Sequence, residues 1–221
     1  MSLPAATPDL IPTRRDPERT RDLILEAALA EFSTKGLGGA RVDEIAARAG
    51  INKRMLYHYF GNKEALFLAA LERVYETIRN AEAALDLQHL EPLAGMRRLV
   101  DFTWRHFTEH PEFVTMLNSE NLHRARHLRR SGKIRALHSP LIAMLDDLLR
   151  RGAAAGVFRA GVDPVQFYIS IASLGYFYFS NIHTLSTIFG RDLTSPAELE
   201  ARHRHMMEVV LGYLRPERNG A

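Results

Sequence analysis

Apolar residues recur at intervals of three and four along almost the whole chain, and alternating strand patterns are missing. This periodicity predicts an all-α fold of about nine helices. The first helix is expected over residues 17 to 35, where Ile24, Ala28 and Phe32 lie on one apolar stripe. Gly36 is expected to end it, because glycine readily adopts the left-handed conformation that follows a helix.

Three further helices are expected in close succession. A short one covers "VDEIAARA", a second runs from Lys53 to Phe60, and a long one runs from Lys63 to about Leu85. Asn52 and Asn62 stand where N-caps are needed. Helices of about eight residues are marginal alone, so the short pair needs packing from its neighbours.

The rest of the chain predicts five more helices, each beginning at or near a proline. Their expected starts are Pro92, a position near Pro111, Pro140 after the cap Ser139, Pro164 after the cap Asp163, and Pro196 after the cap Ser195. The last two starts also carry the glutamine or glutamate of a capping box.

The helix over residues 53 to 60 divides its aromatic side chains between two faces, because residues three and four apart share a face. The inward set is Leu56, Tyr59 and Phe60, and the outward set is Lys53, Arg54, Tyr57 and His58. Two short helices with a basic outward face resemble a helix-turn-helix unit that enters the DNA major groove. Periodicity alone equally allows a helical corner whose polar face is only solvated.

Residues 21 to 67 resemble the N-terminal domain of the TetR family of bacterial transcriptional regulators. The matching patterns are "IL-AA---F---G" in the first helix, "V-EIA--AG" in the second, and "LYHYF-NKEALF" across the third and fourth. The resemblance implies that residues 53 to 60 form the recognition helix. It also implies that Tyr57 and Lys63 contact phosphates.

By the same resemblance, Lys53, Arg54, Met55 and His58 fall at positions that vary with the operator sequence. Family members often have Gly-Thr or Pro-Thr where this chain has Arg54 and Met55. Arg54 can read a guanine or bind phosphate, and Met55 can touch a thymine methyl. Arg41 replaces a threonine that commonly caps the second helix, and it can reach a phosphate instead.

Three segments follow from this comparison: an arm over residues 1–16, a helix-turn-helix domain over 17–63, and a ligand-binding and dimerisation domain over 64–215. Repeated prolines predict that the arm is disordered. Its Arg14 and Arg15 alternatively follow the minor groove of DNA.

The last two helices are expected to form a homodimer interface. The stretch 163 to 190 is apolar on nearly every face, and the last helix has one apolar stripe. That stripe consists of Leu199, His203, Met206, Val210 and Leu214. Pairing with a second copy gives a four-helix interface, and the alternative is a monomer that buries both helices in its own core.

In this family the second domain encloses a small effector, and aromatic, methionine and amide side chains suit a partly apolar or aromatic ligand. The candidate ligand-binding residues are Trp104, Phe107, Met116, Asn121, Met144, Tyr168, Tyr176 and Asn181. The alternative for each is ordinary core packing. The C-terminal part more weakly resembles TetR-family regulators of pyrimidine and nicotinate catabolism.

Net charge +3 allows nucleic acid as a partner without requiring it. Absence of cysteine excludes thiol chemistry and favours a reducing cytoplasm, and no stretch predicts a secretion signal or a membrane span. The basic run "HRARHLRRSGKIR" is interpreted as solvated surface, with subunit contacts, an acidic effector or a second DNA contact as alternatives.

We expect neither an enzyme nor a cofactor, because nucleophile-elbow, phosphate-loop, dinucleotide and His-Glu-x-x-His patterns are absent. The pairs His106/His110 and His123/His127 have a metal-compatible spacing but lack a third ligand, so no metal site is expected. The sequence thus predicts a ligand-responsive, homodimeric repressor that binds a palindromic DNA operator. The alternative is a helical small-molecule-binding protein or enzyme with a vestigial DNA-binding domain.

Overall fold

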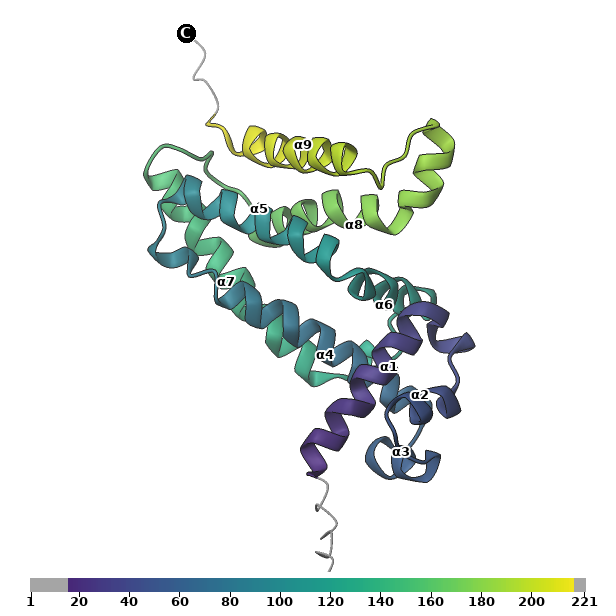
Figure 1. Ribbon diagram of the computed structural model, residues 1–221. Coiled ribbons are helices and arrows are strands. Elements are labelled where there is room, and N and C mark those ends of the chain that lie inside the picture. Colours follow the sequence, from purple (N-terminus) through teal and green to yellow (C-terminus); the bar gives the residue numbers. More distant parts are fainter. Residues whose placement is uncertain (1–15, 217–221) are drawn as a thin grey trace, which may run out of the picture.

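A computed structural model describes residues 16–216, apart from the side chains of residues 135 and 137–139. The part described consists of helices and connecting turns, which confirms the predicted all-α class (Figure 1). The helices are α1 (Pro17–Gly39), α2 (Val42–Arg48), α3 (Lys53–Phe60), α4 (Lys63–Ala83), η1 (Leu87–His89), α5 (Pro92–Glu109), α6 (Pro111–Leu122), η2 (Leu128–Arg130), α7 (Gly132–Ala154), α8 (Pro164–Phe189) and α9 (Pro196–Leu214).

Most predicted helix starts are confirmed by their capping hydrogen bonds. The side-chain oxygens of Asn52, Asn62 and Asp163 each accept a hydrogen bond from a backbone N–H three residues later, at 2.8 Å. These bonds satisfy donors that a helix N-terminus otherwise leaves unpaired. α9 begins at Pro196 as predicted, but Ser195 makes no side-chain capping bond.

The predicted start of α7 is wrong. The helix begins at Gly132 instead of Pro140, and Ser131 is its cap, with the hydroxyl accepting from the N–H of Ile134 at 3.3 Å. Pro140 therefore lies inside the helix. The added first turns are held against α4, because Ser131 donates to the carboxylate of Glu72 at 2.6 Å.

α1 bends where its end was predicted. Gly36 has φ +63°, a backbone conformation that residues with a Cβ rarely adopt, and Leu37 continues beyond it into the core. The N–H of Leu37 donates to the hydroxyl of Ser119 on α6 at 3.3 Å. The bend thus connects the first helix to the second half of the chain.

Two main groups of buried side chains lie at opposite ends of the molecule. The first joins α1–α4 and includes Met116 from α6. The second joins α5, α7, α8 and α9. α4 runs from the first group toward the second beside α7, while α8 and α9 lie farthest from α3 (Figure 1).

The predicted division into segments stays a prediction. Residues 1–15 of the arm lie outside the described residues, and Asp16 caps α1 by accepting from the N–H of Glu18 at 3.0 Å. The division between residues 63 and 64 falls at the first residue of α4.

Candidate DNA-binding surface and effector cavity

The turn between α2 and α3 fixes the orientation of the short helix pair. Gly50 has φ +66°, and its N–H donates to the carbonyl of Ala47 at 3.1 Å. The next N–H, of Ile51, donates to the carbonyl of Ala46 at 3.0 Å. The chain thereby reverses within a few residues, as a helix-turn-helix requires.

α3 presents its two faces as the sequence predicted. Leu56 and Phe60 are buried, and Tyr59 packs half-buried against the same core. On the other side Lys53, Arg54 and His58 are exposed, Tyr57 is 39% exposed, and Met55 is half-buried. The exposed ring of Tyr57 is thus available for contacts outside the chain.

An ion pair joins the exposed ends of α2 and α3. The ammonium of Lys53 lies 3.0 Å from the carboxylate of Asp43, and this hydrogen bond raises the pKa of Lys53. Arg41 is close enough to oppose the shift, and its side chain is exposed. Arg41 makes no side-chain cap for α2, so its guanidinium remains available to phosphate.

Buried Glu31 on α1 positions this end of α2. Its carboxylate accepts from the backbone N–H of Arg41 at 3.0 Å and from the ammonium of Lys35 at 2.9 Å. Burial alone raises the pKa of Glu31, but these hydrogen bonds outweigh burial, and the pKa is lowered. Glu31 therefore stays ionised and anchors the loop before α2.

Lys63 opens α4 directly after α3. Its ammonium reaches the carbonyl of Gly38 at 3.5 Å, a weak contact that a phosphate can replace. All seven predicted DNA-binding positions thus come from the start of α2, from α3 or from the start of α4. They are Arg41, Lys53, Arg54, Met55, Tyr57, His58 and Lys63.

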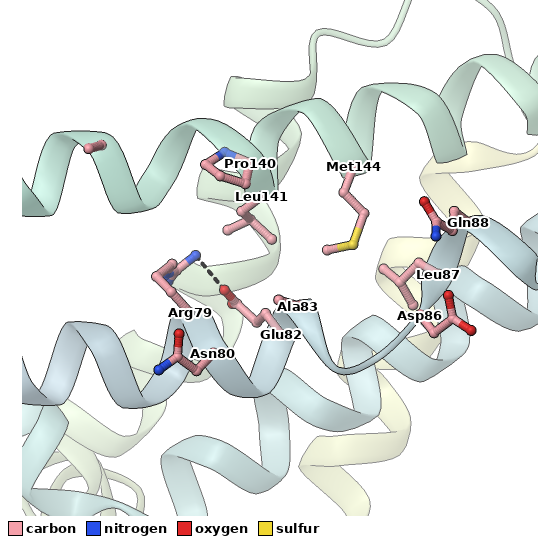
Figure 2. Close-up of a pocket in the computed structure, with 11 residues that line it drawn as sticks. Arg79, Asn80, Glu82, Ala83, Asp86, Leu87, Gln88, Pro140, Leu141 and Met144 are labelled. Atoms are coloured by element: carbon pink, nitrogen blue, oxygen red, sulfur yellow. Dashed lines mark ion pairs between the residues drawn. The ribbon is translucent and has the colours of Figure 1, made fainter.

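At the other end of α4 lies a cavity of about 330 Å³ between α4, η1 and α7 (Figure 2). Its lining residues are Arg79, Asn80, Glu82, Ala83, Asp86, Leu87, Gln88, Ala136, Pro140, Leu141 and Met144. Figure 2 shows Leu141 and Met144 extending from α7 toward the α4 side of the cavity. The walls are therefore mostly apolar, with charged groups concentrated on α4.

A buried ion pair forms part of that wall. Arg79 is 5% exposed and Glu82 is 2% exposed, and their side chains approach to 2.6 Å. Arg79 also donates from Nη2 to the hydroxyl of Tyr168 on α8 at 2.9 Å. Burial raises the pKa of Glu82 to about 7 despite the neighbouring guanidinium, and it also raises the pKa of Tyr168.

The structure separates the predicted ligand-binding residues. Met144 lines the cavity, and Tyr168 is connected to it through Arg79. Trp104 and Phe107 on α5 pack against the ring of Phe179, within the core.

The other four residues lie away from the cavity lining. Met116 is buried in the core of α1–α4. Tyr176 donates to the side-chain oxygen of Asn118 and accepts weakly from exposed Asn121 at 3.4 Å. Asn181 donates to the carbonyl of Phe177 within α8. Their roles in ligand binding remain predictions.

Sequence reasoning missed Arg79 and Glu82, the two buried charged residues of the cavity. A signal was present, because Leu71, Val74 and Ile78 form a buried stripe on α4, and Glu82 is its next member. A carboxylate at a core position calls for a partner, and Arg79 lies one turn earlier.

The basic run contains a buried anchor. The carboxylate of Glu120 accepts from the backbone N–H groups of His127 and Leu128 at 2.8 and 3.0 Å, and it contacts the His127 ring at 2.6 Å. His127 in turn meets the ring of Phe67 on α4, with centroids 5.2 Å apart. The exposed side chains of the run include Arg124, Arg126, Arg129 and Arg130.

Two features are absent from the described part of the chain. No group of three or more histidine, aspartate or glutamate side chains is arranged to hold a metal ion in this part of the chain. No helix over the same residues is long and apolar enough to cross a membrane.

Comparison with known protein families identifies the class of protein. Residues 24–70 match the profile described as "Bacterial regulatory proteins, tetR family", and residues 92–210 match the profile "Tetracyclin repressor-like, C-terminal domain". The chain belongs to the TetR family of bacterial transcriptional regulators. The resemblance seen in the sequence is thereby confirmed.

Individual proteins with similar sequences are named as transcriptional regulators. The chain is 45% identical over 176 residues to "HTH-type transcriptional repressor NicS" of Pseudomonas putida, covering 80% of this chain and 83% of that protein. It is 25% identical over 195 residues to "HTH-type transcriptional regulator RutR" of Escherichia coli K12, covering 87% and 89%. Both alignments extend well beyond the helix-turn-helix.

Solved structures support the fold. The ketosteroid transcriptional regulator KstR2 of Mycobacterium tuberculosis superposes with a TM-score of 0.65 at 23% identity, covering 89% of this chain and 95% of that one. The transcriptional regulator SCO4942 of Streptomyces coelicolor gives 0.65 at 24% identity, covering 88% and 98%. At these identities the similarity concerns the fold alone.

Proposed function

We propose that the protein is a repressor that binds a palindromic operator as a homodimer and releases it when a small effector enters the cavity between α4, η1 and α7. The observation that carries the proposal is the course of α4. This helix begins at Lys63, on the predicted DNA-binding surface, and it carries Arg79 and Glu82 at the cavity. One rigid element therefore touches both sites.

On the DNA side, α3 enters the major groove. Tyr57 and Lys63 hold phosphates on either side of the groove and fix the register of the helix. Arg54 and His58 are exposed and can reach base edges, and half-buried Met55 is adjacent to them. The ion pair between Lys53 and Asp43 leaves Lys53 less free for DNA than its neighbours.

A homodimer is supported by apolar side chains on α8 and α9, although not by the stripe predicted on the last helix, whose last three residues are buried within the protomer. Ile169, Phe177 and Ile188 on α8 are exposed, as are Val209 and Tyr213 on α9. Several exposed large apolar side chains on two helices that pack against each other favour an interface. Pairing these helices with a second copy buries them and gives the two-fold symmetry that a palindromic operator requires.

The effector acts through the spacing of the two recognition helices. Successive major grooves on one face of DNA lie roughly 34 Å apart, so both α3 helices must keep that separation. A ligand that favours another position of α4 lowers the DNA affinity by its difference in affinity for the two arrangements. The relatives named above support the regulator, and one of them is named a repressor.

The test is binding of the purified protein to the DNA flanking its own gene, over a series of salt concentrations. Tyr57→Ala and Lys63→Ala are measured beside Glu26→Ala, which changes an exposed residue of α1 outside the predicted DNA-binding surface. We expect tight, site-specific binding that weakens steeply with salt, and weaker binding in the first two variants only.

Two outcomes oppose the proposal. Weak binding that is equal on unrelated DNA, found also after selection from random sequences, favours a small-molecule carrier with a vestigial DNA-binding domain. Turnover of a ligand that one polar substitution abolishes favours an enzyme.

A further inference from the structure

The ion pair in the cavity wall leaves hydrogen-bonding capacity unused. The Nη2 atom of Arg79 donates to the hydroxyl of Tyr168, but its Nε and Nη1 atoms have no hydrogen-bond partner among the described residues. The Oε2 atom of Glu82, although 2.6 Å from Nη1, is not in hydrogen-bonding geometry either. Unsatisfied buried groups of this kind are costly and call for an explanation.

The position of the two residues beside a cavity supplies that explanation. The unpaired atoms themselves are covered by neighbouring protein atoms, so a ligand reaches them once the Arg79 and Glu82 side chains separate. Arg79 and Glu82 line the cavity on the α4 side, where Figure 2 shows their ion pair facing α7. A guanidinium offers a planar fork of donors that matches two oxygens of a carboxylate. A ligand carrying that group satisfies the donors that the protein leaves unpaired.

The rest of the cavity fixes the size and polarity of such a ligand. Leu87, Leu141 and Met144 give it apolar walls, and about 330 Å³ is at the lower end of the range for small-molecule sites. Apolar walls disfavour an inorganic anion, which must keep its hydration. A compact organic acid with one charged end fits both halves of the site.

We propose that this cavity binds a compact organic monocarboxylate, with the carboxylate on the guanidinium of Arg79 and the apolar body against Leu87, Leu141 and Met144. The inference rests on the proposed function, because it names the effector class of the same cavity. Arg79 is the residue that recognises the ligand. Glu82 competes with the ligand for Arg79 and thereby sets when the site is open.

The ionisation state of Glu82 determines whether it competes with the ligand for Arg79. Burial raises the pKa of Glu82 to about 7, so near neutral pH the carboxyl is often protonated and Arg79 lacks a counter-charge. The charged or ionisable groups around this pair are Tyr75 on α4, Tyr168 from α8, His106 near Arg79 from α5, and Asp86 before η1. The described cavity residues of α7 are apolar.

Proton uptake accompanies ligand binding above that pH. The anion replaces ionised Glu82 at Arg79, and Glu82 takes one proton from solvent, so the charge of the site is conserved. Protonated Glu82 can then donate a hydrogen bond to the bound carboxylate. Affinity for the anion therefore falls as pH rises through about 7.

The test is titration calorimetry of the full chain with benzoate and with benzamide, which share ring and size but differ in charge. We expect benzoate to bind about tenfold tighter or more, since charge-assisted bidentate bonds are roughly twice as strong as neutral ones. Arg79→Lys keeps the charge but loses the fork, and it should reduce the preference for benzoate.

Glu82→Gln distinguishes recognition from a merely structural role. It removes the competitor while keeping Arg79 charged, so benzoate affinity at pH 8 should rise by about tenfold, because only about a tenth of a group with a pKa one unit lower is protonated there. A structural role predicts weaker binding in both variants. Arg79→Met with Glu82→Leu removes both charges, avoids a lone buried charge, and should abolish the preference for benzoate.

Three results overturn the inference: no benzoate binding by the unchanged protein, equal binding of benzamide, or weaker benzoate binding in Glu82→Gln. Operator binding is measured on the same preparations. If the protein binds its operator but does not bind benzoate, the proposed ligand class is wrong and the proposed regulator function is retained. If benzoate binds through Arg79 while no DNA site is found, the ligand class holds and the regulator fails.

Discussion

Among single residues, His106 on α5 couples the stability of the fold to pH. Its ring is buried and its Nε2 atom has no hydrogen-bond partner among the described residues. Burial, together with the charges of His110 and Arg79, lowers the pKa of His106 to about 4. The native state therefore holds the neutral ring where the unfolded chain binds a proton.

We expect stability to be lost as the pH falls from about 6.5 toward 4. Because the pKa is lower in the folded state, the contribution of neutral His106 to stability is complete above the pKa of the unfolded chain. It is lost as the pH falls to the pKa of the folded state. A shift from 6.5 to about 4 corresponds to roughly 3 kcal/mol. Urea unfolding across this range should show a flatter profile for His106→Gln. The exposed His58→Gln should follow the unchanged protein, and an equally steep profile in His106→Gln contradicts the assignment.

Arg54 and Lys63 are expected to affect DNA binding differently. Lys63→Ala should weaken binding about equally on all sequences and reduce the salt slope by about 1, because a phosphate contact is lost. If Arg54 reads guanine, Arg54→Ala should reduce the binding free energy for the operator by about 1–3 kcal/mol. It should also reduce the sequence specificity at one base pair. Competition binding with single-base operator variants measures both. A uniform loss in Arg54→Ala identifies Arg54 as a phosphate contact.

The burial or exposure of a side chain was predictable from sequence where a local pattern determines it. The inward and outward faces of α3 follow from spacing alone, and both appear in the structure. The cavity was less predictable, because Trp104 and Phe107 look the same in sequence whether they fill a core or face a ligand. Only the packing of α5 against α8 distinguishes these cases.

At the scale of elements, local capping signals succeed until tertiary contacts override them. Asn52 and Asn62 cap their helices as predicted. Ser139 and Pro140 have the same pattern, yet α7 begins at Gly132. The preceding turns are secured by an ion pair of Lys133 with Glu76 and by the hydrogen bond from Ser131 to Glu72, and both partners on α4 are distant in sequence.

The end of α7 depends on close packing at Gly152. A Cβ built there meets the ring of Phe158 at 1.8 Å, so any side chain must displace that ring. We expect Gly152→Ala to lower the free energy of unfolding by about 1–3 kcal/mol, as overpacked cores do, although alanine favours helices. Gly132→Ala is the matched control, because its Cβ has nothing within 4 Å. Equal thermal unfolding of both variants contradicts the packing argument.

Across the whole molecule, the proposed operator binding depends on the proposed dimer. α3 lies at one end of the molecule, and α8 and α9 lie at the other (Figure 1). An exposed side chain on α8 therefore makes no contact with the DNA-binding surface of its own protomer. The proposed dimer can thus be tested separately from that surface.

Phe177→Glu tests this separation, since Phe177 is 56% exposed in the middle of α8. Two buried carboxylates facing one another across a two-fold interface repel and are costly to desolvate, so the variant should sediment as a folded monomer. Losing the linked second half-site should weaken operator binding on the order of a hundredfold or more. Leu122→Glu on α6, at a position 84% exposed and outside the proposed interface, should leave mass and affinity unchanged. A Phe177→Glu variant that remains dimeric places the interface elsewhere. A monomer with full operator affinity shows that two-fold geometry is not part of the mechanism. The proposed role of α4, which is to change the spacing of two recognition helices, then fails as well.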